Sequence, residues 1–239
     1  MSGFSNQPKI LRGAFVEYGI SIPPLILVFQ FNPVAISRNR SNSFSAPSFD
    51  QDEKEGGKKG GGLSLREFHQ QDAFEKLDVL RDAQDVRVEP ETISIEIRFD
   101  ATDKLNEGDT ITEQFGIAPE LSTLELMMYP KSESLLGAAI SAIFGGGKVG
   151  YTFTGSERPP MILFIWGRKK VLPVNLNSMS IKEEEFSTDL NPIRATVSVD
   201  MTVIEGPNPP YLYSKVMKEA MSVLNLANLL EVVNVIVPL

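Results

Sequence analysis

The 239-residue chain has no cysteine and a single histidine, and these two scarcities exclude several kinds of chemistry. Without cysteine there are no disulfide bonds, thiolate nucleophiles, zinc–thiolate sites or iron–sulfur clusters. His69 is the only candidate base for a Ser-His-Asp arrangement, and its neighbours Phe68 and Gln70 favour a solvated or interface position. A metal site would need oxygen ligands alone. We therefore expect no catalytic residue, no cofactor and no metal.

Positive charge and long apolar runs are also scarce. The chain has 23 Lys and Arg against 31 Asp and Glu, a formal net charge of −8. This balance argues against nucleic acid as a partner, because phosphates require basic surfaces. The longest apolar runs, 135–144 and 232–239, fall short of the roughly 20 residues that cross a bilayer. Because the N-terminus also lacks a signal-peptide core, we expect a soluble protein without a membrane span.

Two glycine-rich segments and one run of carboxylates are the remaining candidates for chemistry. The segment 144–150 has Val149 where a phosphate-binding loop needs Ser or Thr, and 55–62 lacks the flanking strand and helix. Strand alternation separates Glu184 from Glu183 and Glu185, so this run resembles a solvated strand edge more than a paired acid–base site.

The hydrophobic pattern predicts seven or eight strands and few helices. Because hairpin patterns dominate and no alternating strand–helix series appears, we predict a mainly β (α+β) fold. It is an antiparallel barrel or sandwich with a flanking helix, two insertions and a C-terminal helix. Strands are expected at 9–19, 25–31, 36–44, 91–102, 160–167, 169–187 and 191–205, and helices within 63–89, at 118–130 and at 211–230.

The predicted domain organisation is a β-barrel domain over 1–205 and a helical extension over 206–239. The barrel carries insertions at about 45–90 and 131–158. The loop 45–62 is rich in glycine and charge, so we expect it to order only on assembly. One face of the C-terminal helix is expected to be apolar, formed by Leu212, Val216, Met217, Ala220, Val223 and Leu224.

Residues 25–44 raise the main question about function. An apolar strand ends at Asn32-Pro33, and Arg38 and Arg40 follow at once on one face of the next strand. These cations suit either an anion site or the boundary with a neighbouring subunit. Trp166, at the end of another apolar strand, is typical of a core or interface anchor.

The order of these motifs resembles that of the contractile injection system tube protein family. The resemblance runs from about residue 9 to 205 and rests on VFQFNPVAISRNRS, TISIEIRFDAT, PPMILFIWG and FSTDLNPIRATVSVDMTVIE. The closing hairpin is the most specific part. The residues at family positions there are Phe186, Asn191, Pro192, Arg194 and Ala195, with Asn191 where a turn glycine is common.

The resemblance implies a tail-tube fold assembled as a hexameric ring. It implies that Asn32-Pro33 is the corner between two strands, that Arg38 and Arg40 lie at the subunit boundary, and that Arg194 faces a neighbouring subunit or the lumen. Such proteins sit in the baseplate of phage-tail-like particles, between the spike and the inner tube, and prime tube polymerisation. Many relatives of this kind end in a LysM domain, and we expect none in this sequence, because its tail reads as one amphipathic helix followed by an apolar run.

The partners implied are further copies of the chain in the ring, the spike protein, the inner-tube protein and other baseplate subunits. Assembly is expected in the bacterial cytoplasm, and the finished particle is extracellular or cell-anchored. Two other functions stay open: the repeating inner-tube subunit, and a cell-wall-directed hydrolase or binding protein. The candidate interface or turn residues are Asn32, Pro33, Arg38, Arg40, Trp166, Asn191, Pro192 and Arg194.

Overall fold

The computed structural model describes residues 10–19, 25–46, 64–71, 76–129 and 159–225. The chain divides into two compact units, Met1–Arg38 with Thr92–Leu239, and Asn39–Glu91. Each unit is described by itself. The predicted irregular segment 131–158 and nearly all of the predicted loop 45–62 lie outside the described residues.

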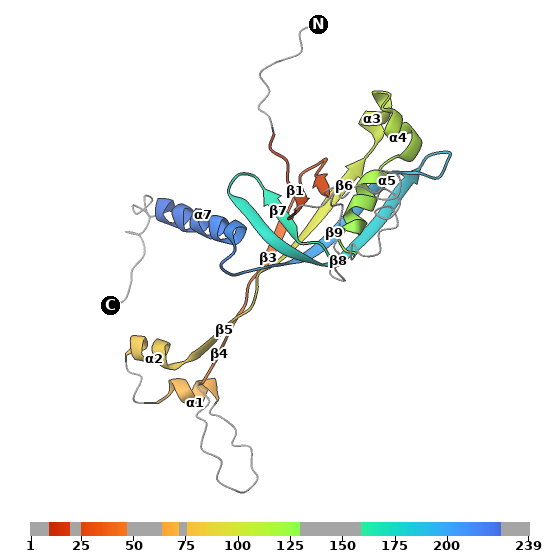
Figure 1. The fold of residues 1–239 in the computed structure, drawn as a ribbon. Coiled ribbons are helices and arrows are strands. Elements are labelled where there is room, and N and C mark those ends of the chain that lie inside the picture. The colour runs from red at the N-terminus through yellow and green to blue at the C-terminus, as the bar shows by residue number, and fades with distance from the viewer. Residues whose placement is uncertain (1–9, 20–24, 47–63, 72–75, 130–158, 226–239) are drawn as a thin grey trace, which may run out of the picture. The chain divides into compact units, whose positions relative to one another are not determined.

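The first unit is built around one antiparallel sheet of seven strands that curls into a half-barrel (Figure 1). This confirms the predicted mainly β, antiparallel fold. The edges of the sheet are β2 and β3. In spatial order, the strands are β2 (Ile26–Val28), β1 (Ala14–Glu17), β7 (Ile162–Trp166), β8 (Lys170–Phe186), β9 (Pro192–Val203), β6 (Thr92–Asp100) and β3 (Ile36–Asn39).

The inner face of this sheet carries the hydrophobic core. In β6 every second residue is buried, as its alternating sequence predicts. Its partner β9 continues the same layer, with Ile95 opposite Val199 and Ile97 opposite Val197. The fully buried side chains of the core include Phe15, Phe29, Ile93, Ile97, Leu124, Met127, Ile162, Phe164, Leu172, Val174 and Met201.

The edge strand β2 lies within the apolar strand predicted at 25–31, but it is buried on one face only. Leu27 is only 4% exposed, whereas Ile26 and Val28 are each 52% exposed. A sheet that packs on the core with one face leaves the side chains of its other face accessible, as those of Ile26 and Val28 are. A continuous apolar run therefore did not mean burial on both faces.

Three helices, α3 (Thr102–Asn106), α4 (Thr110–Phe115) and α5 (Ala118–Leu126), connect β6 to the undescribed segment before β7. Asp109 caps α4 by accepting a hydrogen bond of 2.8 Å from the Thr112 backbone N–H. Helix α5 confirms the helix predicted at 118–130. It starts with Pro119 in its first turn and packs Leu121 and Leu124 onto the core.

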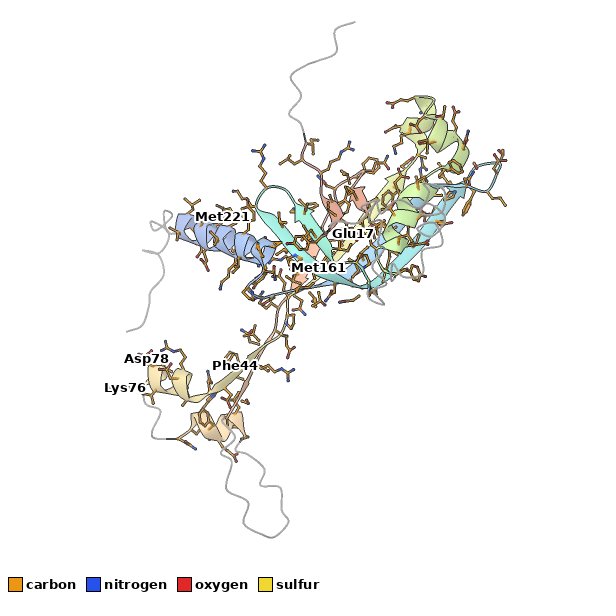
Figure 2. All side chains as sticks on the ribbon, in the orientation of Figure 1. Glu17, Phe44, Lys76, Asp78, Met161 and Met221 are labelled. Carbon is orange, nitrogen blue, oxygen red and sulfur yellow. The ribbon has the colours of Figure 1, made fainter. Side chains whose placement is uncertain are left out.

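The C-terminal helix α7 (Pro209–Asn225) packs on β8 through a polar residue. The buried Ser214 hydroxyl donates to the Val171 carbonyl (2.6 Å) and accepts from the Val171 N–H (2.9 Å). The Lys169 ammonium lies 3.4 Å from the sulfur of Met221, which Figure 2 labels on this helix. The helix predicted at 211–230 is confirmed as far as Asn225, the last described residue.

The second unit contains a two-stranded antiparallel sheet, β4 (Asn42–Ser45) with β5 (Asp85–Val88), and two short helices. Helix α1 (Leu65–His69) begins with a Ser64–Glu67 capping box and buries Phe68. Helix α2 (Leu77–Ala83) follows residues 72–75, which lie outside the described part. Figure 2 labels Phe44 on β4.

The prediction of one continuous strand over residues 36–44 is wrong. Its first half is β3, which joins the seven-stranded sheet, and its second half is β4, which pairs with β5 instead. The Glu89 N–H donates to the Ser41 carbonyl over 3.0 Å, so the second pairing begins just after Arg40. Arg38 and Arg40 therefore do not share one strand face.

Candidate assembly surface

The outer face of the half-barrel is polar and charged where β6, β8 and β9 lie side by side. Alternation that buries the aliphatic residues of these strands turns their polar neighbours outward. A hollow of about 590 Å³ lies on this face beside Phe31. Its lining residues are Phe31, Glu96, Arg98, Phe99, Asp100, Lys182, Glu184, Arg194, Ala195 and Thr196.

Arg194 is the centre of this charged face. Its Nε donates to a carboxylate oxygen of Asp100 over 2.7 Å, and one terminal nitrogen donates to Glu185 over 2.6 Å. The other terminal nitrogen lies 3.5 Å from the Thr102 hydroxyl. The Arg194 side chain is 42% exposed. Arg194 thus joins β9 to the end of β6 and to the end of β8 within one subunit.

The same contacts change the acidity of Asp100. Partial burial raises the pKa of this carboxyl group, but hydrogen bonds from the Thr102 hydroxyl and N–H and the charge of Arg194 outweigh that effect. The pKa of Asp100 is therefore lowered overall. In turn, the hydrogen bond and charge of Asp100 raise the pKa of Arg194. Both shifts favour the ionised forms, so the pair stays ionised.

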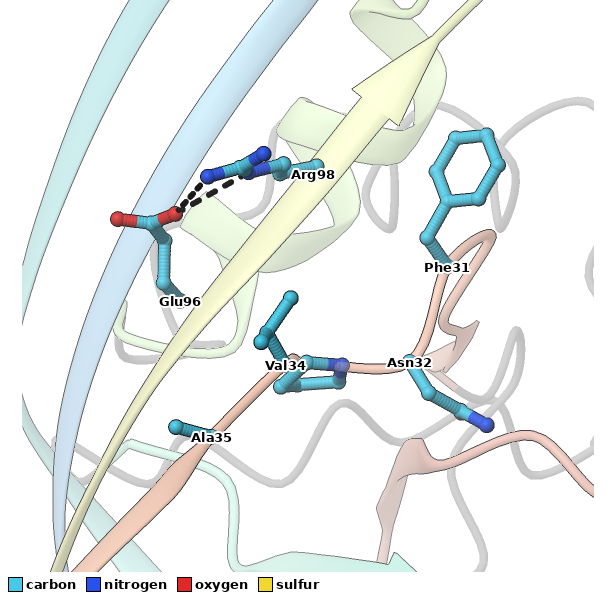
Figure 3. Close-up of a pocket in the computed structure, with 7 residues that line it drawn as sticks. Phe31, Asn32, Val34, Ala35, Glu96 and Arg98 are labelled. Carbon is cyan, nitrogen blue, oxygen red and sulfur yellow. Dashed lines mark hydrogen bonds and ion pairs between the residues drawn. The ribbon is translucent and has the colours of Figure 1, made fainter.

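A second hollow, of about 400 Å³, lies between the loop after β2 and strand β6 (Figure 3). The loop presents apolar side chains: Val34 is 96% exposed and Phe31 is 46% exposed. On the opposite wall Arg98 donates two hydrogen bonds to Glu96, of 3.1 and 2.9 Å. Exposed apolar side chains beside paired charges are typical of the anchor and rim of a protein interface.

Two amide side chains hold this loop in place. Asn32 accepts from the Gly13 N–H and donates to the Leu11 carbonyl, each over 2.9 Å. Gln30 donates to the Asp100 carbonyl (2.6 Å) and accepts from the Asp100 N–H (2.9 Å). Asn32 is thus tied back to its own chain, in agreement with its side chain pointing away from the Glu96–Arg98 pair in Figure 3.

Asn191 and Pro192 end the turn between β8 and β9 and dock on the α4–α5 connection. The Asn191 side chain donates to the Gln114 carbonyl over 2.7 Å. The Pro192 carbonyl accepts from the Ile117 N–H over 3.0 Å, beside Gly116. Gly116 has φ 58° and leaves no room for a Cβ next to that carbonyl. These contacts give both hairpin residues a role inside the subunit.

Trp166 ends β7 and packs against the core. Its ring is stacked near Phe164, with centroids 6.2 Å apart. A Cβ at Gly13 would meet both this ring and Phe29, so the glycine permits the close approach. Trp166 is only partly exposed, which fits the core reading of this residue better than that of an interface anchor.

Arg38 and Arg40 belong to different units. Arg38 is an exposed residue of β3. Arg40 lies after that strand, in the second unit, and its guanidinium is 3.4 Å from the Glu91 carboxylate, whose side chain is 3% exposed. The charge of a buried carboxylate needs such a partner. Arg40 therefore has a structural partner in its own chain.

The side chains of this surface are suited to binding another protein. Its cations and anions are paired within the chain, including Lys182 with Glu184, and its exposed apolar groups are Phe31 and Val34. Across the described ranges, no cluster of His, Cys, Asp or Glu is placed to hold a metal ion. None of the helices in that part of the chain has the length and apolarity to cross a membrane.

The comparison with known families agrees with this fold. The model for "contractile injection system tube protein" matches residues 23–208, well over half of the chain. The chain belongs to this family. A search of curated proteins found no match. Members of a tube family are structural components of contractile injection systems, so this protein assembles with other parts of such a particle.

Some of the residues that build this surface in the tube protein were not identified from the sequence. Gln30 and Asp100 were not singled out, although Gln30 belongs to the VFQFNP motif that carried the resemblance. Gly116 was also missed, because its role depends on the carbonyl of Pro192, which is remote in sequence. A polar residue inside an otherwise apolar run was the available indication for Gln30.

Proposed function

We propose that this tube-family protein is a baseplate component that forms a hexameric ring, joins the spike to the inner tube and primes tube assembly. The observation that carries the proposal is the second compact unit. Strands β3 and β6 are neighbours in the sheet, so a short connection would suffice between them. Instead Asn39–Glu91 fill it with a separate small sheet and two helices.

A repeating tube subunit is stacked between identical copies of itself, whereas an adaptor at the end of a tube also joins it to different proteins. Additional surface is useful to the second kind of protein. The unit Asn39–Glu91 presents exposed apolar groups, such as Phe44, Val86 and Val88 on its two strands, each at least 47% exposed. Such groups support contacts with the spike or with other baseplate subunits.

The ring itself is supported by the outer face and edges of the first unit. The apolar loop residues Phe31 and Val34 lie beside the paired charges of Glu96 and Arg98, at the side of the sheet that ends in β3. A neighbouring subunit that covers them gains about 1.5–3 kcal/mol for each large apolar side chain. We infer that this region is the contact between subunits. Arg38, which follows the loop in sequence, and Arg194, which lies on the same sheet, belong to it.

Copy number tests the adaptor role against that of the inner tube. Quantitative mass spectrometry would measure this chain relative to the sheath protein in particles separated by length. An adaptor contributes one ring, so its amount per particle stays constant as the tube lengthens. An amount that rises in proportion to sheath identifies it as the repeating tube subunit and overturns the proposal.

Membership of a structural family favours a role without catalysis, and we infer that this protein has no catalytic activity. The alternative of a cell-wall-directed hydrolase or binding protein predicts activity or binding on peptidoglycan. A pull-down on purified peptidoglycan, together with a turbidity assay, measures both. Binding or clearing by the purified protein would favour that alternative. The same proposal implies that the protein assembles in the bacterial cytoplasm and that the finished particle is extracellular or cell-anchored.

A further inference from the structure

Strand β8 joins two ends of the first unit that differ in charge. It starts at the β7–β8 turn, where residues 168–170 are all basic, and it ends with three glutamates at 183–185. Figure 1 shows the first end beside α7 and the second beside α4 and α5. About 45 Å of strand lies between them at about 3.4 Å per residue, far more than the Debye length of about 8 Å at physiological salt. The charges of the two ends therefore do not neutralise each other within one subunit.

The acidic end consists of residues 102–126 and 182–194. The Asn191 amide donates to the Gln114 carbonyl over 2.7 Å, so the β8–β9 turn lies against α4. Together the two segments hold ten acidic side chains against three basic ones. Exposed apolar side chains lie among these charges: Ile111, Phe115, Phe186 and Leu190 are 61%, 51%, 51% and 79% exposed.

Leu190 is held outward in a backbone conformation that disfavours it. Its φ is 62°, in the left-handed region, where glycine or asparagine is usual and a bulky side chain is rare. Backbone hydrogen bonds keep the turn in this form. The Leu190 N–H donates to the Ser187 carbonyl over 3.0 Å, and the Ser187 N–H donates to the Asn191 carbonyl over 2.9 Å. An exposed apolar side chain at such a position indicates a contact outside the subunit.

The basic end consists of residues 166–170 and helix α7. The Tyr213 hydroxyl donates to the Arg168 carbonyl over 2.6 Å, which joins the helix to the β7–β8 turn. The turn and the described residues of the helix hold five basic side chains against one acidic side chain, Glu219. Apolar side chains are exposed here too: Leu212, Tyr213 and Val216 are 44%, 44% and 54% exposed.

We propose that the acidic end of one copy of the chain binds the basic end of the next copy, so that the subunits of the ring are joined head to tail. Opposite charges around apolar side chains give an attractive contact with an apolar centre and a polar rim. A contact between two like ends would bring charges of the same sign together. Two different surfaces that fit each other are what a closed ring of identical chains requires.

This inference rests on the ring of the proposed function and names the two surfaces of its contact. The acidic end adjoins the region already assigned to that contact, because the hollow beside Phe31 is also lined by Glu184 and Arg194. Both ends belong to the first unit. The contact therefore requires the ring and does not depend on the adaptor role.

Charge reversal at each end, in the full-length chain, tests the contact. The first variant changes four exposed residues of the acidic end: Glu107→Lys, Glu113→Lys, Glu183→Lys and Asp189→Lys. The second changes three exposed residues of the basic end: Arg168→Glu, Lys169→Glu and Lys215→Glu. By count, the first variant has a surplus of positive charge at both ends, and the second has a surplus of negative charge at both ends.

A matched control carries the same change of net charge in the second unit. It combines four substitutions: Asp78→Lys, Asp82→Lys, Asp85→Lys and Glu89→Lys. The control and the first variant both bring the formal net charge from −8 to zero. A melting curve of each protein verifies that it folds, and mass photometry at low ionic strength measures assembly.

Each end variant alone should assemble about tenfold or more weakly than the unchanged protein, because its contacts join like charges. An equal mixture of the two should form rings again, since six is an even number and every contact in an alternating ring joins opposite charges. The control should assemble as the unchanged protein does. A mixture no better than either variant alone, or end variants that assemble like the control, would overturn the head-to-tail contact and leave the ring standing. Unchanged protein that stays monomeric would overturn the ring itself, and this inference with it.

Discussion

Replacing Gly116 with alanine tests how the closing hairpin is held to the rest of the subunit. Gly116 ends α4 with φ 58° and ψ −130°, a backbone conformation that residues with a side chain rarely adopt. The added Cβ would overlap the carbonyl oxygen of Pro192. That oxygen accepts the Ile117 hydrogen bond of 3.0 Å, so strand β9 and the start of α5 cannot both keep their positions.

The expected loss of stability has two parts. A residue other than glycine in a sparsely populated backbone region costs about 1–3 kcal/mol. Displacing Pro192 removes the Ile117 hydrogen bond and adds about 0.5–1.5 kcal/mol. Gly116→Ala should therefore cost about 1.5–4.5 kcal/mol. For a chain of this size, each kcal/mol lowers Tm by about 2–4 °C, which gives a total fall of about 3–18 °C.

Gly108→Ala separates the overlap from the backbone strain. Gly108 also has a positive φ, of 74°, but a Cβ there would meet no atom within 4 Å. This control should lose only the strain energy. Urea unfolding of both variants, followed by circular dichroism, gives the comparison. If Gly116→Ala is no less stable than Gly108→Ala, the contact between Gly116 and Pro192 does not stabilise the hairpin.

Four further substitutions extend the test. Val199→Asp should unfold the first unit, because it puts an unpaired charge at a residue that is 1% exposed; loss of the circular dichroism signal checks this. Arg194→Glu should keep the fold and lose up to about 1 kcal/mol of stability for each exposed ion pair, and sizing chromatography should show weaker ring formation. A Tm as low as that of Val199→Asp would refute the assignment of Arg194 to the outer face. Asn32→Ala should lose about 1–3 kcal/mol in urea unfolding, because two backbone partners lose their hydrogen bonds; an unchanged midpoint would count against that role. The pKa of Asp100 is lowered in the folded state, so its ionisation stabilises the fold above the ordinary carboxyl pKa, and this contribution disappears as pH falls through the lowered pKa. Asp100→Asn should therefore flatten the acid side of a plot of stability against pH. Equal slopes for the variant and the unchanged protein would contradict this prediction.

The long strands could be predicted from the sequence because their alternation is strict and one face is buried. β6 and β9 follow this rule over nearly their whole length, with Ile95 and Val199 facing each other in the core. The pattern failed at residues 36–44, where the alternation continues but the pairing partner changes from β6 to β5. Alternation records the side that a residue faces and carries no information about the strand beside it.

The candidate surface was predictable only in part. The resemblance singled out Asn32, Asn191 and Arg194, and the structure gives each one several partners within the subunit. The residues that complete those contacts, such as Gln30 and Asp100, come from remote parts of the chain. A motif marks one side of a long-range contact, and the other side becomes visible only once the strands are paired.

Helix α7 shows why the direction of an amphipathic helix does not follow from its periodicity. The spacing of Leu212, Val216 and Val223 defines an apolar face, and the usual expectation is that such a face packs on the core. Here two hydrogen bonds between Ser214 and Val171 fix the opposite side on β8. A hydroxyl that both donates and accepts at one residue of a strand satisfies two polar groups at once. The polar contact sets the orientation of the helix, and the apolar side chains of the opposite face stay exposed.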